Sequence, residues 1–360
     1  MRIKVGDITK IKTGKLDANS ASKDGKYPFF TCSREPLKIS SYSYDCECVL
    51  VAGNGDLNVK YYNGKFDAYQ RTYIIENNSD GKLYMPYLYF FMEGYVEELR
   101  HQAIGGVIKY IKLGNLTDAM IELPSVEEQR NIVKILFKAK QILEQREIEL
   151  EKLDNLIKAR FVEMFGDIII NDKNWNCEPL GYLCTIVRGG SPRPIEQFLG
   201  GDVPWIKIGD ATDGDNIYLS STKEHIIQEG VNKSRLVKSG SLIFANCGVS
   251  LGFARIITFD GCIHDGWLAM EDIDERLDKI FLLHALNQMT EHFRAIAPAG
   301  TQPNLNTTIM KAYKQVIPPI ELQRDFIRFA EQVDKSKVAV QKALDEAQQL
   351  FDSLMQEYFG

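Results

Sequence analysis

The chain has 360 residues, of which 44% are hydrophobic and 26% are charged, values typical of globular proteins rather than of disordered or fibrous ones. It contains no run of about 18 apolar residues, and its charged N-terminal segment does not resemble a signal peptide, so we expect a cytoplasmic protein without a membrane span. The net charge is −6 and no segment is strongly basic, which argues against indiscriminate binding to nucleic acid.

Residues 1–124 are predicted to form a small α+β domain. Short runs of β-branched and aromatic residues alternate with clusters of Gly, Asn and Asp, a pattern that favours strands joined by tight turns. A helical stretch near residues 88–100 closes this block. The segment carries 16 basic and 15 acidic side chains, so any surface for a polyanion must be a local patch.

Residues 125–166 are predicted to form one long helix. Apolar residues recur at steps of 4 and 3 from Ile132 onwards, a period of 3.5 that is typical of a coiled-coil seam. Pro124 directly precedes the helix, where the fixed φ of proline is tolerated. A helix of this length spans about 60 Å, so its apolar stripe must be buried against something equally long.

Residues 167–317 are predicted to form a second α+β domain, weakly related to the first. PLGYLCTIVRG parallels KVGDITKIKTG, VPWI parallels YPFF, and LIFANCG parallels VLVAGNG. We also align Phe259–Asp260 with Phe66–Asp67. A helical stretch near residues 277–297 closes the block, which carries 14 basic and 18 acidic side chains.

Residues 318–360 are predicted to repeat the long helix. VIPPIELQR lies 194 residues after ELPSVEEQR, and the same offset keeps the heptad register, which only Lys337 breaks. We expect the two helices to pair within one chain, where their effective concentration is high, with dimerisation of two chains as the alternative. The predicted helix-pairing residues are Ile132, Leu136, Leu143, Leu150, Leu153, Ile157, Phe326, Val333, Val340, Leu344, Phe351 and Leu354.

The sequence contains no recognisable catalytic motif. It lacks a Gly-rich dinucleotide or phosphate loop, the zinc-protease and serine-hydrolase motifs, and an Asn/Asp-Pro-Pro-aromatic methylation motif. The seven cysteines and five histidines show no metal-ligand spacing, so we predict no metal site. His264–Asp265 could suggest a catalytic pair, but a surface hydrogen-bonding role is favoured. The chain is predicted to bind and position rather than to catalyse.

Two dissimilar domains that alternate with two similar long helices, each introduced by an apolar-Pro-x-x-E-x-Q-R element, point to a known family. This layout closely resembles the specificity subunit of type I DNA restriction–modification systems. The resemblance implies two target-recognition domains held apart by antiparallel helices, which together recognise a split, asymmetric DNA site. It also implies double-stranded DNA, two adenine-N6 methyltransferase subunits and restriction/translocase subunits as partners. S-adenosylmethionine and ATP with Mg²⁺ are expected on those partners and no cofactor on this chain.

The candidate DNA-binding residues are basic and amide side chains in the predicted Gly-rich loops. Arg can read guanine and Asn can read adenine through paired hydrogen bonds, whereas Lys more often contacts phosphate. In the first domain they are Lys12, Lys15, Lys26, Arg34, Asn54, Asn58, Lys60 and Arg71. In the second domain they are Arg188, Arg193, Lys207, Arg235, Asn246 and Arg255.

Two other functions are compatible with the same sequence. One is the specificity subunit of a related methylation system without a translocating motor, because the motor would lie on another chain. The other is a scaffold that carries two binding domains on a coiled-coil stalk and has no affinity for DNA.

Overall fold

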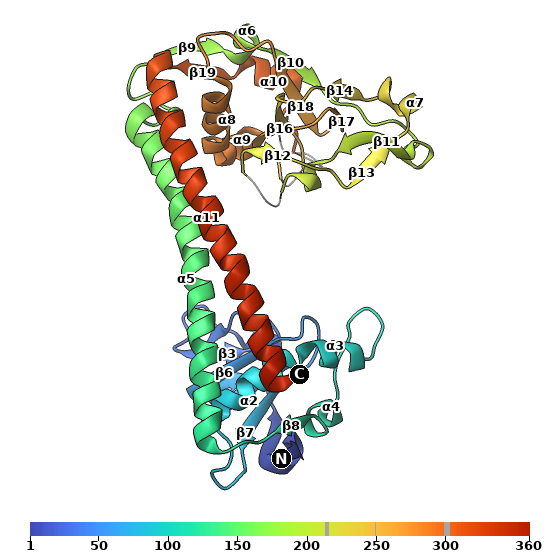
Figure 1. Cartoon of the computed structure of the whole chain (residues 1–360), viewed down its shortest axis with the longest axis vertical. Coiled ribbons are helices and arrows are strands. Elements are labelled where there is room, and N and C mark those ends of the chain that lie inside the picture. The colour runs from blue at the N-terminus through green and yellow to red at the C-terminus, as the bar shows by residue number, and fades with distance from the viewer. Residues whose placement is uncertain (213–215, 249, 299–302) are drawn as a thin grey trace. The chain divides into compact units, whose positions relative to one another are not determined.

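A computed structural model describes residues 1–212, 216–248, 250–298 and 303–360. The chain divides into two compact units, one made of Met1–Glu149 with Val340–Gly360 and the other of Leu150–Ala339. Each unit contains one α+β block and part of both long helices (Figure 1). The predicted fold class is therefore confirmed: two β-rich domains accompany two long helices.

The first unit is built on a six-stranded sheet with the order β2-β7-β5-β6-β3-β4. Helix α2 (Met85–Gly94) is almost entirely buried, and its side chains share a cluster with apolar residues of β5 and of both long helices. The other elements of the block are β1 (Arg2–Lys4), α1 (Val5–Ile8), β2 (Thr9–Thr13), η1 (Ala18–Ser20), β3 (Tyr27–Phe30), β4 (Leu37–Ile39), β5 (Tyr44–Ala52), β6 (Val59–Ala68), β7 (Thr72–Asn77), α3 (Val96–Gln102), α4 (Leu113–Thr117) and β8 (Met120–Glu122).

The second unit contains a five-stranded sheet, β10-β18-β15-β16-β12, and a four-stranded sheet, β13-β11-β17-β14. Helix α8 (Lys279–Gln288) occupies the buried position that α2 has in the first unit. The remaining elements are β9 (Asn176–Pro179), α6 (Leu180–Leu183), β10 (Thr185–Arg188), η2 (Ile195–Gln197), β11 (Leu199–Ile206), η3 (Ile208–Asp210), β12 (Tyr218–Leu219), β13 (Glu224–Ile226), α7 (Gln228–Val231), β14 (Arg235–Val237), β15 (Leu242–Ala245), β16 (Ala254–Ile257), β17 (Gly261–Ile263), β18 (Trp267–Glu271), α9 (Thr290–Ile296), α10 (Thr307–Ala312) and β19 (Lys314–Ile317).

The two blocks share part of their strand pairing, although the first has one six-stranded sheet and the second has two smaller sheets. β3 pairs in parallel with the end of β6, and β11 pairs in parallel with β17. In the register, Phe29 lies opposite Asp67 and Trp205 lies opposite Cys262. The alignment of Phe259–Asp260 with Phe66–Asp67 is therefore wrong by two residues, because a shared dipeptide does not fix a strand register.

The two long helices, α5 (Val126–Phe165) and α11 (Ile320–Phe359), begin in the same way. The side chain of Gln129 is fully buried, accepts a hydrogen bond from the Tyr84 amide and donates to the carbonyls of Lys82 and Pro124. Gln323 makes the equivalent three bonds, to the Asp278 amide and to the carbonyls of Arg276 and Pro318. The repeated sequence motif thus fastens the start of each helix to the loop before α2 or α8.

Within each unit a segment of α5 packs with a segment of α11. In the first unit, Leu136 near the start of α5 shares a cluster with Phe351 near the end of α11. In the second unit, Phe161 near the end of α5 lies 5.3 Å, between ring centroids, from Phe326 near the start of α11. The helices therefore run antiparallel. The predicted helix-pairing positions that are buried are Ile132, Leu136, Leu143, Ile157, Phe326, Val333 and Val340, and those that are half-buried are Leu150, Leu153, Leu344, Phe351 and Leu354.

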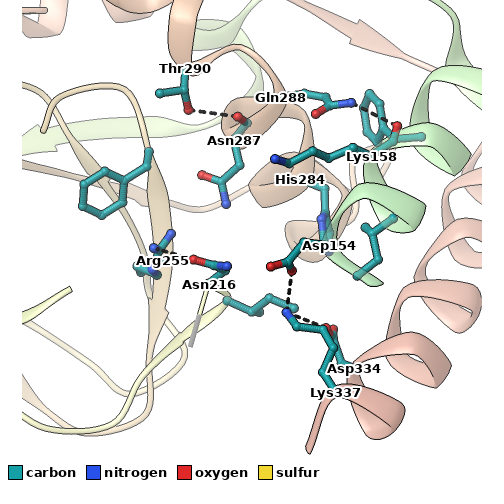
Figure 2. Close-up of a pocket in the computed structure, with 14 residues that line it drawn as sticks. Asp154, Lys158, Asn216, Arg255, His284, Asn287, Gln288, Thr290, Asp334 and Lys337 are labelled. Carbon is teal, nitrogen blue, oxygen red and sulfur yellow. Dashed lines mark hydrogen bonds and ion pairs between the residues drawn. The ribbon is translucent and has the colours of Figure 1, made fainter. Parts of the chain in front are cut away.

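Lys337, which breaks the apolar seam, is accommodated there by two carboxylates. Its ammonium lies 2.7 Å from a carboxylate oxygen of Asp154 on α5 and 3.6 Å from one of Asp334 on its own helix. Figure 2 shows this group of charges at the edge of a cavity in the second unit. A polar pair in an otherwise apolar seam favours one register of the two helices over others.

Candidate nucleic-acid interface

In the second unit, the turn after β10 lies directly against the end of β17. Gly189 and Gly190 form this turn, and their amides donate to the carbonyls of Trp267 and Ile263. A Cβ atom on Gly189 would lie 2.2 Å from the His264 carbonyl oxygen. Any side chain would therefore clash with this carbonyl, and only glycine fits here. The close approach brings the loop that carries Arg188 and Arg193 to His264 and Asp265, 75 residues or so away in the sequence.

Asp265 is the centre of the polar contacts made by this loop. The Ser191 hydroxyl donates to its Oδ1 at 2.6 Å, and the Arg188 Nε donates to its backbone carbonyl at 2.9 Å. Nη2 of Arg193 lies 3.9 Å from Oδ2 of the same carboxylate. Two predicted DNA-binding arginines therefore contact Asp265, Arg188 at its backbone carbonyl and Arg193 at its carboxylate. Asp265 itself was not predicted as a binding residue.

His264 completes this cluster as a neutral imidazole. Its Nδ1 accepts from the Gly266 amide at 2.9 Å, which leaves the proton on Nε2, 3.3 Å from Oδ1 of Asp265. Burial lowers the pKa of His264, although Asp265 opposes that effect. Burial alone would raise the pKa of Asp265, but the Ser191 hydrogen bond and the neighbouring positive charges outweigh it and lower the pKa. Asp265 is therefore ionised at neutral pH.

The Asp265 cluster borders a concave region of about 640 Å³. Lys207, a third predicted residue, lines it and forms an ion pair with Glu224, with its ammonium 5.8 Å from the centre of the Trp205 ring. The lining of this region thus carries two cations, Arg193 and Lys207, and three carboxylates, Glu196, Glu224 and Asp265. This region combines hydrogen-bond donors, acceptors and an aromatic wall without an excess of positive charge.

In the first unit, a different set of residues gathers around Asp56. Nε of Arg34 donates to its carboxylate at 3.1 Å, and Nη2 of Arg100 donates to it at 3.3 Å. Asn58 donates to the Asp56 carbonyl at 2.8 Å and accepts a hydrogen bond from Lys60. The structure therefore brings together three predicted residues, Arg34, Asn58 and Lys60, and adds Arg100.

The other predicted residues lie apart from these two clusters or are engaged elsewhere. Lys12 forms an ion pair with Glu76 on the neighbouring strand, and Arg235 lies 4.0 Å from Glu271. Asn54 forms an isolated bridge with Tyr110 through its backbone. Three further predicted residues, which are in neither cluster, have exposed side chains: Lys15, Lys26 and Arg71.

Two of the predicted DNA contacts are corrected by the structure. Asn246 is fully buried, and its amide nitrogen lies 3.3 Å from both the Asn304 side-chain oxygen and the Leu305 carbonyl. Arg255 is 7% exposed, donates to the Ala254 carbonyl and lies over the Phe253 ring. Neither side chain presents a free edge to solvent, so we assign both to the internal packing of the second unit.

Arg255 instead faces a cavity of about 240 Å³ inside the second unit, shown in Figure 2. Asp154 and Lys337 of the helix pair lie on the opposite side, and His284 of α8 lies behind them. Burial, together with the nearby Lys337 charge, lowers the pKa of His284 to about 4, so the imidazole is neutral at physiological pH.

Several site residues were missed by sequence reasoning because only the fold brings them together. Arg100 lies on α3, and nothing in its local sequence connects it to Asp56. Ser191 lies between two predicted arginines and could have been found from the loop that contains it. Among the described residues, no helix is long and apolar enough to cross a membrane, and no group of three or more His, Cys, Asp or Glu side chains is arranged to hold a metal ion.

Comparison with known proteins identifies the family. A family model described as "Type I restriction modification DNA specificity domain" matches residues 1–152 and 172–347. The chain belongs to the specificity subunits of type I restriction–modification systems. This specificity subunit is non-catalytic, directs methylase and restriction subunits to DNA, and belongs to a system whose cofactors reside on partner subunits.

Individual relatives of the specificity subunit cover nearly its whole length. It is 28% identical to the "Type I restriction enzyme EcoDI specificity subunit" of Escherichia coli, over 99% of this chain and 87% of that protein. It is 19% identical to the MjaVIII specificity subunit of Methanocaldococcus jannaschii, over 95% of this chain and 89% of that one.

Solved structures show the same fold. The S subunit of M. genitalium superposes with a TM-score of 0.59 at 17% identity, over 100% of this chain and 96% of that chain. A chain from a study of complex assembly and conformational transition in the type I system gives a TM-score of 0.62 at 15% identity, over 100% of this chain and 97% of that chain.

Proposed function

We propose that this specificity subunit recognises a split, asymmetric DNA site, with one half-site read by residues 1–124 and the other by residues 167–317. In this proposal residues 125–166 and 318–360 are spacer helices that separate two target-recognition domains. The observation that carries the proposal is that two blocks with related strand pairing bear two unlike polar clusters, around Asp56 in one block and around Asp265 in the other. A repeated scaffold with different side chains fits two different base sequences.

The charge of the two clusters indicates that partner subunits contribute part of the contact with DNA. In each cluster some cations are paired with carboxylates, as Arg34 is with Asp56 and Lys207 is with Glu224. Because affinity for DNA arises mainly from neutralised phosphates, clusters of this kind supply selectivity more than affinity. We infer that the methyltransferase subunits, which bind S-adenosylmethionine, provide much of the phosphate contact.

The outer surface of α5 supports the docking of these partners. Large apolar side chains remain exposed along this helix: Ile135, Phe137, Ile142, Ile148, Leu156 and Val162. Ile135, Ile142 and Leu156 are separated by multiples of seven residues, so they share one face, and an exposed apolar stripe of this kind suits packing with another helix. Since α5 and α11 are repeats of one unit, we infer two copies of the methyltransferase, with restriction/translocase subunits that use ATP and Mg²⁺ joining the complex in the cytoplasm.

The test is to express the subunit with its methyltransferase in cells that lack other adenine methylation and to map N6-methyladenine by single-molecule sequencing. We expect one motif made of two different specified parts separated by unspecified bases. The same motif is expected with or without restriction subunits, since the sequence specificity lies in this chain. A continuous motif, or methylation without sequence preference, would refute the proposal.

A further inference from the structure

We propose that Arg193 reads a guanine in the second half-site and that Asp265 is the positioning residue that holds its guanidinium for this task. The inference rests on the proposed function and assigns roles within the cluster that the proposal treats as a whole. It also separates Arg193 from Arg188, which lies in the same loop but contacts Asp265 differently.

The first argument is the exposure of Arg193. Its side chain is 80% exposed, and its ion pair with Asp265 involves one terminal nitrogen at 3.9 Å. Among the described residues Arg193 makes no other ion pair, so the remaining N–H groups of its fork stay available for a ligand. Arg188 is held differently, because its Nε donates to the backbone carbonyl of Asp265 at 2.9 Å. The planar guanidinium of an exposed arginine is the group that pairs with O6 and N7 of guanine.

The second argument is that Asp265 is itself fixed from several sides. Oδ1 receives the Ser191 hydroxyl at 2.6 Å and faces Nε2 of His264 at 3.3 Å, while the His264 ring is held by the Gly266 amide. Oδ2 is left to face Arg193. A carboxylate anchored in this way limits the orientations of the arginine beside it, which reduces the ordering cost when the arginine binds a base.

The third argument concerns the class of ligand. Around the concave region, the two cations Arg193 and Lys207 are outnumbered by the carboxylates Glu196, Glu224 and Asp265, and His264 is neutral. A site for phosphate would need an excess of positive charge. A mixed set of donors and acceptors next to an exposed arginine instead suits the edge of a base pair, which is neutral and carries its own donors and acceptors.

The experiment compares three variants of the full complex: Asp265→Asn, Arg193→Lys and the control Asp260→Asn. Asp260 also pairs with a surface cation, Lys238, at 2.7 Å, but lies outside the concave region. The readouts are the methylated motif and competition binding with DNA duplexes substituted at each position of the second half-site, measured at several salt concentrations.

We expect Asp265→Asn and Arg193→Lys to lose discrimination at the same guanine position by about 10- to 100-fold, the range for one bidentate contact. Arg193→Lys keeps the charge, and Asp265→Asn removes only a charge that does not face phosphate, so the salt dependence of both should match the wild type. Asp260→Asn should leave the motif unchanged. Thermal unfolding of each variant distinguishes a loss of folded protein from a loss of base discrimination. If Asp265→Asn unfolds, Arg193→Lys still tests the inference, because Arg193 is exposed and its replacement should not affect folding.

Three results would overturn the inference while leaving the proposed function intact. The first is a second half-site without guanine, and the second is an unchanged motif in the Arg193→Lys complex. The third is a loss of affinity in the Arg193→Lys complex that is uniform over all positions of the half-site, which would show that Arg193 does not read a base. Methylation without any split motif in the wild type would instead refute the proposed function itself.

Discussion

Replacing Leu136 by Asp is expected to lower the free energy of unfolding of the isolated subunit by about 4 kcal/mol or more. Leu136 is 0% exposed and lies in the cluster that joins α5, α2 and the end of α11, so the substitution would bury an unpaired charge and leave a cavity. Urea denaturation followed by circular dichroism measures the change.

The neighbouring residue on the same helix provides the control. Ile135 is 44% exposed, so Ile135→Asp should change the free energy of unfolding by no more than about 0.5 kcal/mol. The same control variant should weaken assembly with the methyltransferase if the exposed stripe of α5 is the docking surface. Equal stabilities for Leu136→Asp and the wild type would show that the helix seam is not packed as described.

A second large effect is expected from changing the length of α5. Inserting four residues after Glu147 adds about 6 Å, close to two base-pair steps, and almost restores the facing of the helix because 3.6 residues make one turn. A coiled coil absorbs such an insertion as a stutter. If α5 sets the spacing of the two recognition domains, the unspecified gap in the methylated motif should lengthen by one or two base pairs while both half-sites stay the same.

An insertion of two residues at the same place serves as the contrasting variant. It rotates the following part of the helix by about 200°, so the apolar seam and the exposed stripe would no longer continue in line. We expect this variant to lose assembly with the methyltransferase and all methylation. A four-residue variant that is active with an unchanged gap would show that another element fixes the spacing.

The long helices were predictable because their signals are local and repeated. A heptad pattern and a preceding proline placed the first helix at residues 125–166, and the structure has it at Val126–Phe165. The repeated motif contains Gln129 and Gln323, but the three hydrogen bonds that each of them makes are known only from the structure. Signals of this kind depend on residues that are close in the sequence.

The candidate interface was only partly predictable because it depends on contacts between distant strands. Sequence reasoning selected Arg188 and Arg193 from a Gly-rich loop, and the structure places both at Asp265. The same reasoning selected Asn246 and Arg255, which are buried, because residue type alone does not reveal which face of a strand or turn meets solvent. The identity of a residue suggests a contact, but its orientation comes from the fold.

The most direct test of the central claim, that each recognition domain reads its own half-site, is an exchange of residues 167–317 for the corresponding domain of another specificity subunit of known motif. Single-molecule sequencing of cells that carry the chimera with the original methyltransferase measures the outcome. The account predicts a motif in which the half read by residues 1–124 and the gap are retained, and only the other half is replaced. A change in both halves, or in neither, would contradict it.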